Sequence, residues 1–463
     1  MNEQSTLALL EPFFESAYPA KTRTFIEFSE QEVILATGPR KGLNFSCDLM
    51  PWTRLVLQEF GNSKWRRCYA TGSVQSGKTL LYVVIPTLYH LFELREDVII
   101  GAPSSLLARA VVEDKILPSI MMSKFKCLLP SEGSFARQGR MVDRIKFGNG
   151  TTLRLLGASG GDDQRSSHTA PAIVMTEIDK MDQPQTTSRE ASPIDQLESR
   201  AQSFGDRSRI YGECTVSLKE GRIWREVQEI GTGTQIFLCC KHCGLWQVPQ
   251  RQNFIGWREA PTIIDARASG AYRCSGCAVG WAEQDRQWSL DRPKLLSNGQ
   301  SIDRWGNVCG DMPKTTTFGL RWNALHTSLV SQAELAELEW RCEKTDDSIQ
   351  LRRVLQFLWS EPLEESDTVQ VRARAELILK TKITDVPRGQ VPDWADHVTV
   401  GVDLGGHQCW WVACAWGCGG RGHLLDCGWV DIPQDRERQA ALLDSLRNWG
   451  DELARRSWAQ NGQ

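Results

Sequence analysis

The chain has 463 residues, 41% of them hydrophobic, and a formal net charge of −3 from 54 basic and 57 acidic side chains. This composition indicates a globular protein of two or three domains. The balanced charge excludes a basic field over the whole chain, so any DNA contact would need a local basic patch. No apolar run is long enough for a transmembrane helix, and the N-terminus lacks the pattern of a secretory signal. We therefore expect a cytosolic protein whose 15 cysteines are mostly reduced.

Strands and helices are expected to alternate over the first half of the chain. An arm with short helical patches, such as 7–16, precedes an amphipathic stretch at 50–60. The predicted elements after it are a strand at 67–70, a buried helix at 80–93 kinked at Pro86, strands at 98–101, 172–176 and 209–215, a hairpin at 144–156, and a helix at 194–204. This alternation favours an α/β fold with a parallel sheet.

The second half of the chain has a different character. Residues 236–290 hold two cysteine pairs, and 291–315 are polar and predicted to be rich in loops. The remaining predicted elements are helices at 331–344 and 349–359, a linker near 387–392, and strands at 398–402, 409–416 and 423–430.

A glycine-rich phosphate loop follows the strand at 67–70. It consists of Gly72, Ser73, Val74, Gln75, Ser76, Gly77, Lys78 and Thr79, which have the Walker A spacing. Such glycines let backbone N–H groups face the phosphates, the lysine neutralises phosphate charge, and the Thr79 hydroxyl would ligate Mg²⁺. The alternative is a chance glycine-rich turn, which the strand–loop–helix context disfavours. The loop predicts ATP binding.

Acidic residues follow the buried strand at 172–176. A P-loop enzyme needs acids there to hold Mg²⁺ and to activate water, and Glu177 is the predicted general base. The usual aspartate before it is replaced by Thr176. Asp179 is a candidate helper, and a helix-capping carboxylate is the alternative interpretation for both acids. Arg165 and Arg200 are candidates for sensing the γ-phosphate, although ordinary surface arginines explain them as well.

Two CxxC pairs predict a structural zinc site. Cys240 and Cys243 form the first pair, and Cys274 and Cys277 form the second. Each pair can present two thiolates from one tight turn, which Gly244 and Gly276 would favour, and four thiolates make a closed tetrahedral zinc site. A redox pair or unliganded buried cysteines are the alternatives. Cys239 and His242 are alternative ligands.

One further aspartate ends an apolar strand, because Asp403 follows Val398–Val402 and precedes a tight turn. RNase H-like nucleases present their first metal-binding aspartate in this way, and a two-metal site needs further carboxylates. Asp426 and Asp431 lie downstream, and a turn-capping role is the alternative for Asp403.

The order of these motifs resembles the large subunit of tailed-phage terminases of the lambda type, the GpA family. The matching segments run from about residue 50 to 430: TGSVQSGKT, VIIGAPSS with DKILPSI, LRLLGASGGDDQRSS, IVMTEID, LESRAQSFGDRSRIYGECTVS, RIWREV, CCKHCG, YRCSGC, FGLRWNAL, FLWSEP and VGVDLGG. By this resemblance Thr215 stands where an ATPase-coupling hydroxyl is expected.

The resemblance implies an ATP-driven motor that translocates duplex DNA into a procapsid, with a metal-dependent endonuclease. The implied cofactors are ATP, Mg²⁺ and Zn²⁺, with Asp403 as a nuclease Mg²⁺ ligand. The implied partners are double-stranded DNA, a terminase small subunit, the portal of the procapsid and further copies of the chain on DNA, in the host cytoplasm of a phage or prophage, with no membrane. Since the chain stops about 60 residues after Asp403, we expect a C-terminally truncated nuclease that cuts DNA poorly.

The expected architecture is a RecA-like P-loop ATPase with a parallel sheet, a zinc-ribbon insertion and a partial RNase H-like domain. The expected segments are an arm at 1–45, the ATPase domain at 46–235, the zinc ribbon at 236–290, a connecting region at 291–395 and the incomplete nuclease domain at 396–463. A helicase-like or DNA-repair P-loop ATPase with a zinc ribbon is the alternative, as is an inactive prophage remnant.

Overall fold

The computed structural model describes residues 21–130, 143–158, 168–181, 191–345, 348–363, 386–405, 408–433, 438–455 and Trp458. The chain divides into two compact units, Met1–Arg372 and Ala373–Gln463. The predicted helical patch at 7–16 and the candidate Arg165 lie outside the described residues.

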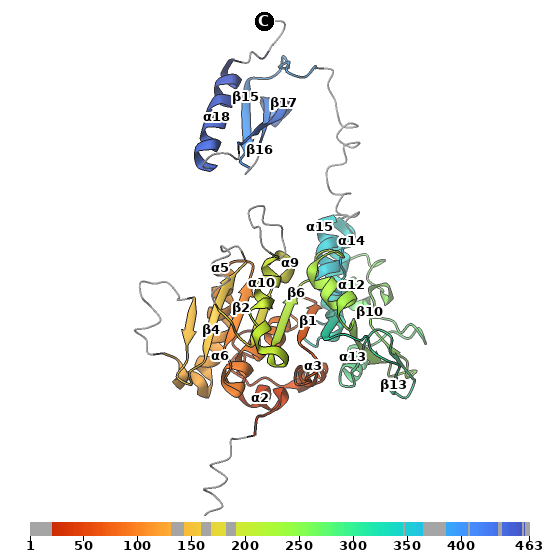
Figure 1. Ribbon diagram of the computed structural model, residues 1–463. Helices are drawn as coiled ribbons and strands as arrows, with labels where there is room; N and C mark the ends of the chain where they lie inside the picture. The colour runs from red at the N-terminus through yellow and green to blue at the C-terminus, as the bar shows by residue number, and fades with distance from the viewer. Residues whose placement is uncertain are drawn as a thin grey trace, which may run out of the picture. The chain divides into compact units, whose positions relative to one another are not determined.

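The larger unit is built on one sheet in the order β11-β7-β14-β1-β6-β5-β2-β4-β3, with β8 paired to β7 (Figure 1). The neighbouring strands from β7 to β4 run parallel, and β11 and β3 add antiparallel edges. The strands are β1 (Arg67–Gly72), β2 (Val98–Ala102), β3 (Arg144–Lys146), β4 (Thr152–Gly157), β5 (Ala172–Thr176), β6 (Arg209–Cys214), β7 (Thr234–Cys239), β8 (Trp246–Gln247), β11 (Lys294–Leu296) and β14 (Thr317–Trp322). The predicted α/β class with a mostly parallel sheet is confirmed.

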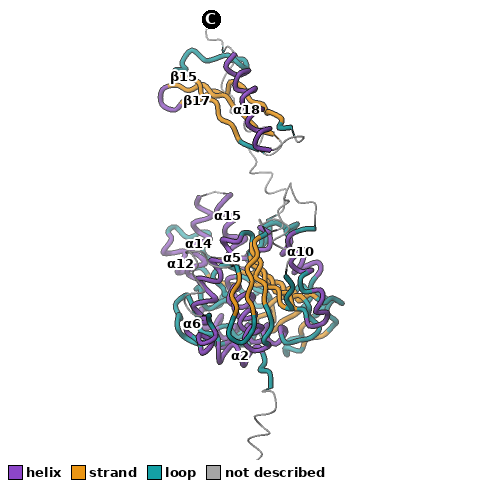
Figure 2. Tube along the Cα trace, turned by 60° about the vertical axis from the view of Figure 1, so that its left-hand side comes forward, coloured by secondary structure: helices purple, strands orange, loops and turns teal. Residues whose placement is uncertain are grey.

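Alternating side chains of the central strands enter two separate cores. Cys68 and Ala70 of β1 belong to one core, whereas Tyr69 between them belongs to the other, as the two-residue period of a strand requires. Helices therefore cover both faces of the sheet, as the tube view shows (Figure 2). The first core takes in α2 (Phe25–Glu32), α3 (Trp52–Phe60), α5 (Ser105–Val111) and α6 (Leu117–Met122), and the second takes in α9 (Ile178–Met181), α10 (Pro193–Ser199) and α11 (Arg222–Trp224).

A continuous helical segment follows the glycine-rich loop, as predicted. It comprises Leu80–Val84, α4 (Ile85–Leu88) and Tyr89–Leu94, and its flanking turns are wider than an α-helix. Pro86 near the start of α4 donates no backbone hydrogen bond, and such a residue loosens the helical ladder around it. The segment ends where Arg95 adopts a left-handed conformation with φ of 56°. It packs against β5 and β6, so it fixes the loop's far end.

The structure refines several predicted elements. The predicted helix at 194–204 is wrong in its second half, because α10 ends at Ser199 and a separate turn, Gln202–Arg207, contains Gly205 with φ of 54° and ψ of −127°. The polar stretch 291–315 contains the short strands β11, β12 (Ser301–Ile302) and β13 (Val308–Cys309). The ATPase domain was expected to end at residue 235. The sheet nevertheless includes β7 and β14, most of whose residues come after that position in the chain.

The cysteine-containing segment forms a small subdomain beside β7. Its elements are β9 (Phe254–Ile255), β10 (Ala271–Tyr272), α12 (Ile263–Ser269) and α13 (Glu283–Leu290). It packs through α12 against α14 (Gln332–Thr345), which leads to α15 (Ser348–Val354) and the helical turn η10 (Leu355–Trp359). The predicted helices at 331–344 and 349–359 are thus confirmed, the second as α15 and η10 in succession.

The smaller unit is a three-stranded antiparallel sheet with one helix. The strands β15 (His397–Asp403), β16 (Gln408–Gly417) and β17 (Arg421–Asp431) lie in chain order, and α18 (Arg438–Arg455) follows them. Its core includes Trp411 and Leu425, and Trp449 of α18 packs against it. The three strands match the prediction, whereas the sequence interpretation omitted α18.

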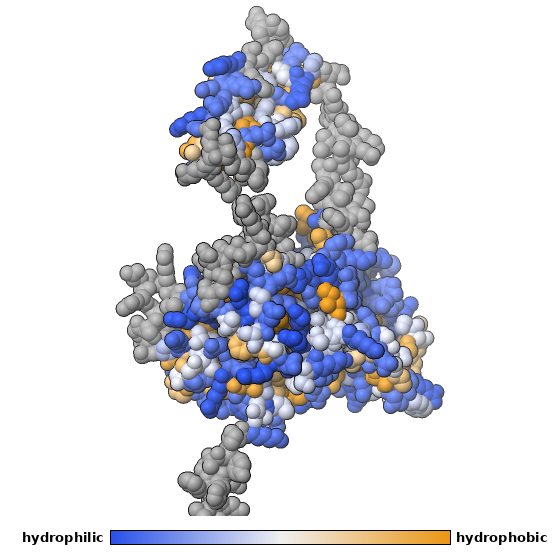
Figure 3. Space-filling model, viewed as in Figure 1, coloured by the Kyte–Doolittle hydropathy of each residue, from blue (hydrophilic) through white to orange (hydrophobic). Residues whose placement is uncertain are grey.

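Among the described residues, no helix is long and apolar enough to cross a bilayer. The face of the larger unit seen in Figure 3 is mostly hydrophilic, with small separate apolar patches. The buried apolar side chains of this unit form the two cores around the sheet.

Candidate nucleotide and metal sites

The phosphate loop sits at the end of a central strand, with β14 and β6 on either side of β1. Gln75 and Gly77 have φ of 54° and 85°, which turns the backbone between strand and helix. Trp322 at the end of β14 supports the loop, since its indole N–H donates to Ser76 Oγ at 2.8 Å. A Cβ atom on Gly72 would lie 2.3 Å from the Trp322 ring, so only glycine fits there.

The Lys78 ammonium lies inside the loop. Its Nζ donates to the carbonyl oxygens of Gly72 at 2.8 Å and Ser73 at 3.0 Å, and the residue is 8% exposed. Burial lowers the pKa of Lys78, and the nearby Glu213 carboxylate opposes this shift. A buried cation whose direct hydrogen-bond partners are neutral carbonyls is well suited to meet an anion.

A cavity of about 650 Å³ opens beside the loop. The loop contributes Gln75, Gly77, Lys78 and Thr79 to its wall. Another part of the wall comes from the N-terminal segment, from Ile34 to Arg40, from Asn44 to Ser46, and from Leu49 and Met50, and includes apolar side chains such as Phe45. The cavity thus joins a polar part lined by the loop to a more apolar part, as nucleotide pockets do. Arg200 is not among the described residues that line it.

The two predicted acids, Glu177 and Asp179, have different partners in the structure. Glu177 directly follows β5, adopts φ of 56° and forms an ion pair with Lys180 at 2.9 Å. Asp179 instead anchors the loop after β6, because its carboxylate accepts from the backbone N–H groups of Ser217 at 3.2 Å and Ile223 at 2.8 Å. Asp179 is therefore engaged in a structural contact. Burial lowers the pKa of Lys78, and Glu177 lies near enough to oppose that lowering.

A buried glutamate that the sequence analysis did not single out lies between these elements. Glu213 of β6 is 2% exposed, and its Oε1 accepts hydrogen bonds from Thr176 Oγ1 at 2.5 Å and Thr79 Oγ1 at 3.4 Å. Burial raises the pKa of Glu213. Its signal in the sequence was a lone acid in an otherwise uncharged stretch of strand, RIYGEC, after Arg209.

Thr215 follows β6 and begins the loop that Asp179 anchors. Two residues later the Ser217 carbonyl accepts from Gln356 Nε2 at 2.7 Å, and the N–H of Val74 in the phosphate loop donates to Phe357 O at 2.8 Å. The segment around η10 therefore touches both the phosphate loop and the loop that starts at Thr215.

The four predicted cysteines converge. The sulfur atoms of Cys240, Cys243, Cys274 and Cys277 lie within 4.8 Å of one another. Each pair comes from one tight turn, closed by Gly244 N–H to Cys240 O at 2.8 Å and by Ala278 N–H to Cys274 O at 3.0 Å. The alternative ligands point elsewhere: the His242 ring contacts Asp285 at 3.2 Å, and Cys239 Sγ contacts the carbonyl of Cys240 at 3.8 Å.

The glycines of the two turns play different roles. Gly244 has φ of 75°, as a left-handed turn position requires, but in the second turn that position is Ala278 with φ of 60°. Gly276 instead provides space, because a Cβ there would lie 2.7 Å from Leu245 Cδ2. Gly276 therefore lies within the second turn but does not occupy its left-handed position, which Ala278 takes.

The candidate nuclease residues lie on the smaller sheet. Asp403 ends β15 opposite Trp410, and it is exposed. Asp426 on β17 accepts from Arg388 Nε at 2.6 Å, and Asp431 accepts from Gln408 Nε2 at 2.7 Å. Among the described residues, three or more potential metal ligands come together in one place, and these are the four cysteines. Asp403 does not belong to such a group.

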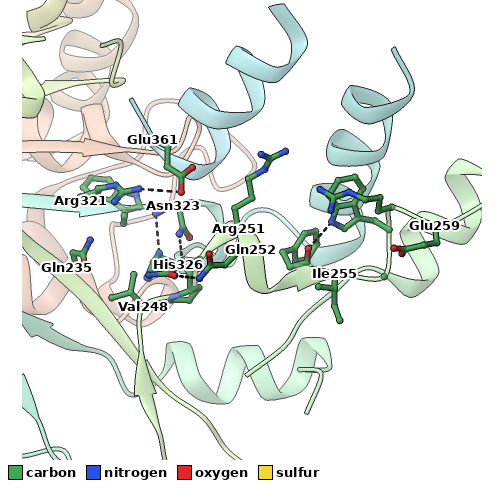
Figure 4. A pocket seen from close by; sticks show the side chains of 17 residues that line it. Gln235, Val248, Arg251, Gln252, Ile255, Glu259, Arg321, Asn323, His326 and Glu361 are labelled. Atoms are coloured by element: carbon green, nitrogen blue, oxygen red, sulfur yellow. Dashed lines mark hydrogen bonds and ion pairs between the residues drawn. The ribbon is translucent and has the colours of Figure 1, made fainter. Parts of the chain in front are cut away.

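A second cavity, of about 690 Å³, lies between the cysteine subdomain and β14 (Figure 4). Polar side chains line it, including Arg321, Asn323, His326 and Glu361. His326 is fully enclosed, with Nε2 2.9 Å from Ile236 O and Nδ1 accepting from Asn323 N–H at 3.1 Å. No residue of the phosphate loop belongs to its described lining, whereas the loop does line the cavity of about 650 Å³.

A parallel sheet with helices on both faces and a glycine-rich loop after a central strand defines a P-loop ATPase. The family model for the ATPase domain of phage terminase large subunit gpA matches residues 40–295, and the model for the gpA endonuclease domain matches residues 317–458. The chain therefore belongs to the gpA family of phage terminase large subunits. It is the ATPase of a viral DNA packaging motor, and its family uses nucleotide and divalent metal and acts with DNA, a portal and a small subunit.

Two solved structures are weakly similar to this chain in fold. A mutant ATPase domain of the Thermus phage P74-26 large terminase is 10% identical, with a TM-score of 0.35, over 67% of this chain and 93% of that one. A large terminase from a thermophilic bacteriophage is 11% identical, with a TM-score of 0.34, over 85% of this chain and 70% of that one. These values support no comparison of residues. A comparison with curated protein sequences finds no match.

Proposed function

We propose that the larger unit binds MgATP in the cavity beside the phosphate loop and hydrolyses it to move duplex DNA. The observation that carries this proposal is the Lys78 ammonium, buried inside the loop at the polar part of a 650 Å³ cavity. ATP phosphates would replace neutral carbonyls as its partners, and charge neutralisation is the main protein contribution to phosphoryl transfer.

Each predicted residue has a distinct role in this proposal. The loop N–H groups from Gly72 to Thr79 hold the phosphates, and the Thr79 hydroxyl contributes to the Mg²⁺ site. The oxygens of Thr79 and Glu213 are the hard donors that Mg²⁺ takes, so the residues fit the ion. Bound Mg²⁺ would neutralise charge on the phosphate oxygens. Glu177, next to β5, orients and deprotonates the attacking water.

Thr215 would couple hydrolysis to movement on DNA. It lies two residues beyond Glu213 and begins the loop whose Ser217 contacts both Asp179 and Gln356. A shift at the nucleotide would therefore reach the segment around η10 through one short loop. The order of contacts supports Thr215 as the first residue of this route.

The cysteine subdomain would hold one structural Zn²⁺. Four sulfur atoms within 4.8 Å of one another, on two tight turns, are the donor set of a closed tetrahedral zinc site. The pairing of His242 with Asp285 and the separate position of Cys239 favour Cys240, Cys243, Cys274 and Cys277 as the ligands.

For the endonuclease domain we propose Asp403 as one metal-binding carboxylate. Its place at the end of β15 leaves the side chain open to solvent. Asp403→Ala should abolish any Mg²⁺- or Mn²⁺-dependent nicking of plasmid DNA, whereas the exposed Asp451→Ala on α18 should not. Nicking that survives in Asp403→Ala would contradict this role.

The complete assembly would contain several copies of the chain on double-stranded DNA, joined to the portal of a procapsid and guided by a small subunit, in the host cytoplasm. The deciding experiment measures phosphate release with DNA, with procapsids and with both. A packaging motor should be stimulated most by both together. Stimulation by DNA alone with strand separation would indicate a helicase-like ATPase, and absent turnover would indicate an inactive remnant.

Lys78→Ala tests the nucleotide site itself. We expect turnover to fall at least about tenfold with the fold intact, because the variant removes the charge that neutralises the phosphates. Lys294→Ala, on the exposed part of the edge strand β11, is the matched control and should retain full activity. Equal turnover in Lys78→Ala and the control would rule out this nucleotide site.

A further inference from the structure

The Walker B position of this chain lacks an aspartate, because Thr176 ends β5 where the acid is expected. Mg²⁺ in a P-loop site is usually held by oxygen donors that include at least one carboxylate. A neutral hydroxyl at residue 176 supplies an oxygen but no charge. The site therefore needs a carboxylate from another element.

Glu213 lies in the place from which such a carboxylate could act. In the sheet, β6 lies between β1 and β5, and Glu213 pairs in register with Ala70 of β1 and Thr176 of β5. The residue is therefore one strand away from the missing aspartate, at the same level of the sheet. Its side chain reaches the start of the helix that follows the phosphate loop, where Thr79 Oγ1 lies 3.4 Å from its Oε1.

Two hydroxyls converge on this one carboxylate oxygen. Thr176 Oγ1 donates to Glu213 Oε1 at 2.5 Å, and Thr79 Oγ1 approaches the same oxygen. Thr79 is the residue whose hydroxyl belongs to the proposed Mg²⁺ site, so the carboxylate and the metal-binding hydroxyl are already neighbours. Thr176 holds the glutamate in this orientation.

The burial of Glu213 also needs an explanation. Carboxylates with 2% exposure are rare unless they are paired or bind metal. Burial raises the pKa of Glu213, while Lys78 nearby lowers it. The Lys78 ammonium donates to the carbonyls of Gly72 and Ser73, so two neutral hydroxyls are the direct hydrogen-bond partners of the carboxylate. A divalent cation beside Thr79 would compensate the buried charge.

We propose that Glu213 supplies the carboxylate of the Mg²⁺ site in place of the missing Walker B aspartate, with Thr176 as its positioning residue. The carboxylate of the site thus comes from β6 instead of the neighbouring strand β5, while Glu177 remains the general base. This inference rests on the proposed ATP site and specifies how that site binds its metal.

The test compares nucleotide binding with and without Mg²⁺, using a fluorescent ATP analogue at equilibrium. Glu213→Gln keeps the shape and an acceptor for Thr176 but removes the charge. We expect the gain in affinity that Mg²⁺ confers to fall at least about tenfold, while metal-free affinity stays equal or improves because a negative charge near the phosphates is gone. Glu226→Gln, which alters another buried glutamate, paired with Arg222, should leave the gain unchanged.

A reciprocal variant separates metal binding from folding. Thr176→Asp combined with Glu213→Gln returns the acid to β5, and the Mg²⁺ dependence should recover to within about threefold of the wild type. Retained Mg²⁺ dependence in Glu213→Gln, or no recovery in a folded double variant, would overturn the proposal. If Lys78→Ala abolishes nucleotide binding while Glu213→Gln behaves as wild type, only the assignment of Glu213 fails and the ATP site stands.

Discussion

Ala278 shows how one backbone position can affect stability in the cysteine subdomain. It adopts φ of 60°, whereas the equivalent position of the first turn is Gly244 with φ of 75°. A side chain in the left-handed region costs about 1 kcal/mol relative to glycine. The two turns are therefore alike in shape and differ in strain.

This difference predicts two variants of opposite sign. Ala278→Gly should raise the free energy of unfolding by about 1 kcal/mol, and Gly244→Ala should lower it by about the same amount. A Cβ on Gly244 meets nothing within 4 Å, so its effect is strain alone. Urea unfolding of the metal-loaded proteins measures both changes in the free energy of unfolding. Equal stabilities of the two variants would show that the left-handed conformation of these residues does not affect stability.

His326 gives the larger unit a pH-dependent stability. Burial lowers its pKa from 6.5 to about 4, so the folded protein keeps the ring neutral while the unfolded chain protonates it. The unfolded state then binds more protons between these values, and stability is present above about pH 6.5 and is lost as the pH falls toward 4. The loss from pH 7.5 to 5 should be about 2 kcal/mol.

The check is a comparison of His326→Gln with the wild type. The variant cannot gain this proton, so its stability should decline less between about pH 7.5 and 5. Any metal loss on acidification is common to both proteins and cancels in the difference. Parallel pH profiles for the two proteins would show that His326 does not titrate in this way.

At the scale of elements, the sequence predicted the pieces whose signals are local. The strand β1, the phosphate loop and the helical segment after it follow from spacing and apolar runs, as do the two cysteine turns. The role of Glu213 could not be predicted, because it depends on β6 lying between β1 and β5, a non-local pairing. The place of β14 in the sheet was missed for the same reason, whereas α18 was overlooked although its amphipathic pattern is local.

The cysteine subdomain is predicted to carry one zinc ion per chain. Elemental analysis of protein purified without chelator should find it, and the double variant Cys240→Ser, Cys274→Ser should lose it, because each turn then lacks one thiolate. A double variant of two of the exposed cysteines outside the cluster, Cys127→Ser and Cys309→Ser, should retain the metal. Zinc that persists in the first double variant would place the ion elsewhere.

At the scale of the whole chain, the charge balance limits how DNA is held. With a net charge of −3, contacts to the phosphate backbone must come from local groups of basic side chains. We expect the affinity of this chain alone for duplex DNA to fall at least about tenfold between roughly 50 and 200 mM salt. Protein binding releases cations condensed on the DNA, and this release is less favourable when the salt concentration is higher. Tight binding that is flat over this range would indicate readout of bases.

The segment around η10 connects the phosphate loop to the loop that starts at Thr215. It is held at one point to the phosphate loop through Val74 and at another to the Thr215 loop through Ser217, and the Leu363 N–H also donates to Ser217 O at 3.1 Å. The residues after 363 lead along the chain to the second unit. The match to the gpA endonuclease model begins at residue 317, so it already includes the segment that contacts these two loops. A shift of the Thr215 loop during turnover would therefore strain the hydrogen bond between Val74 and Phe357, because η10 joins the two loops.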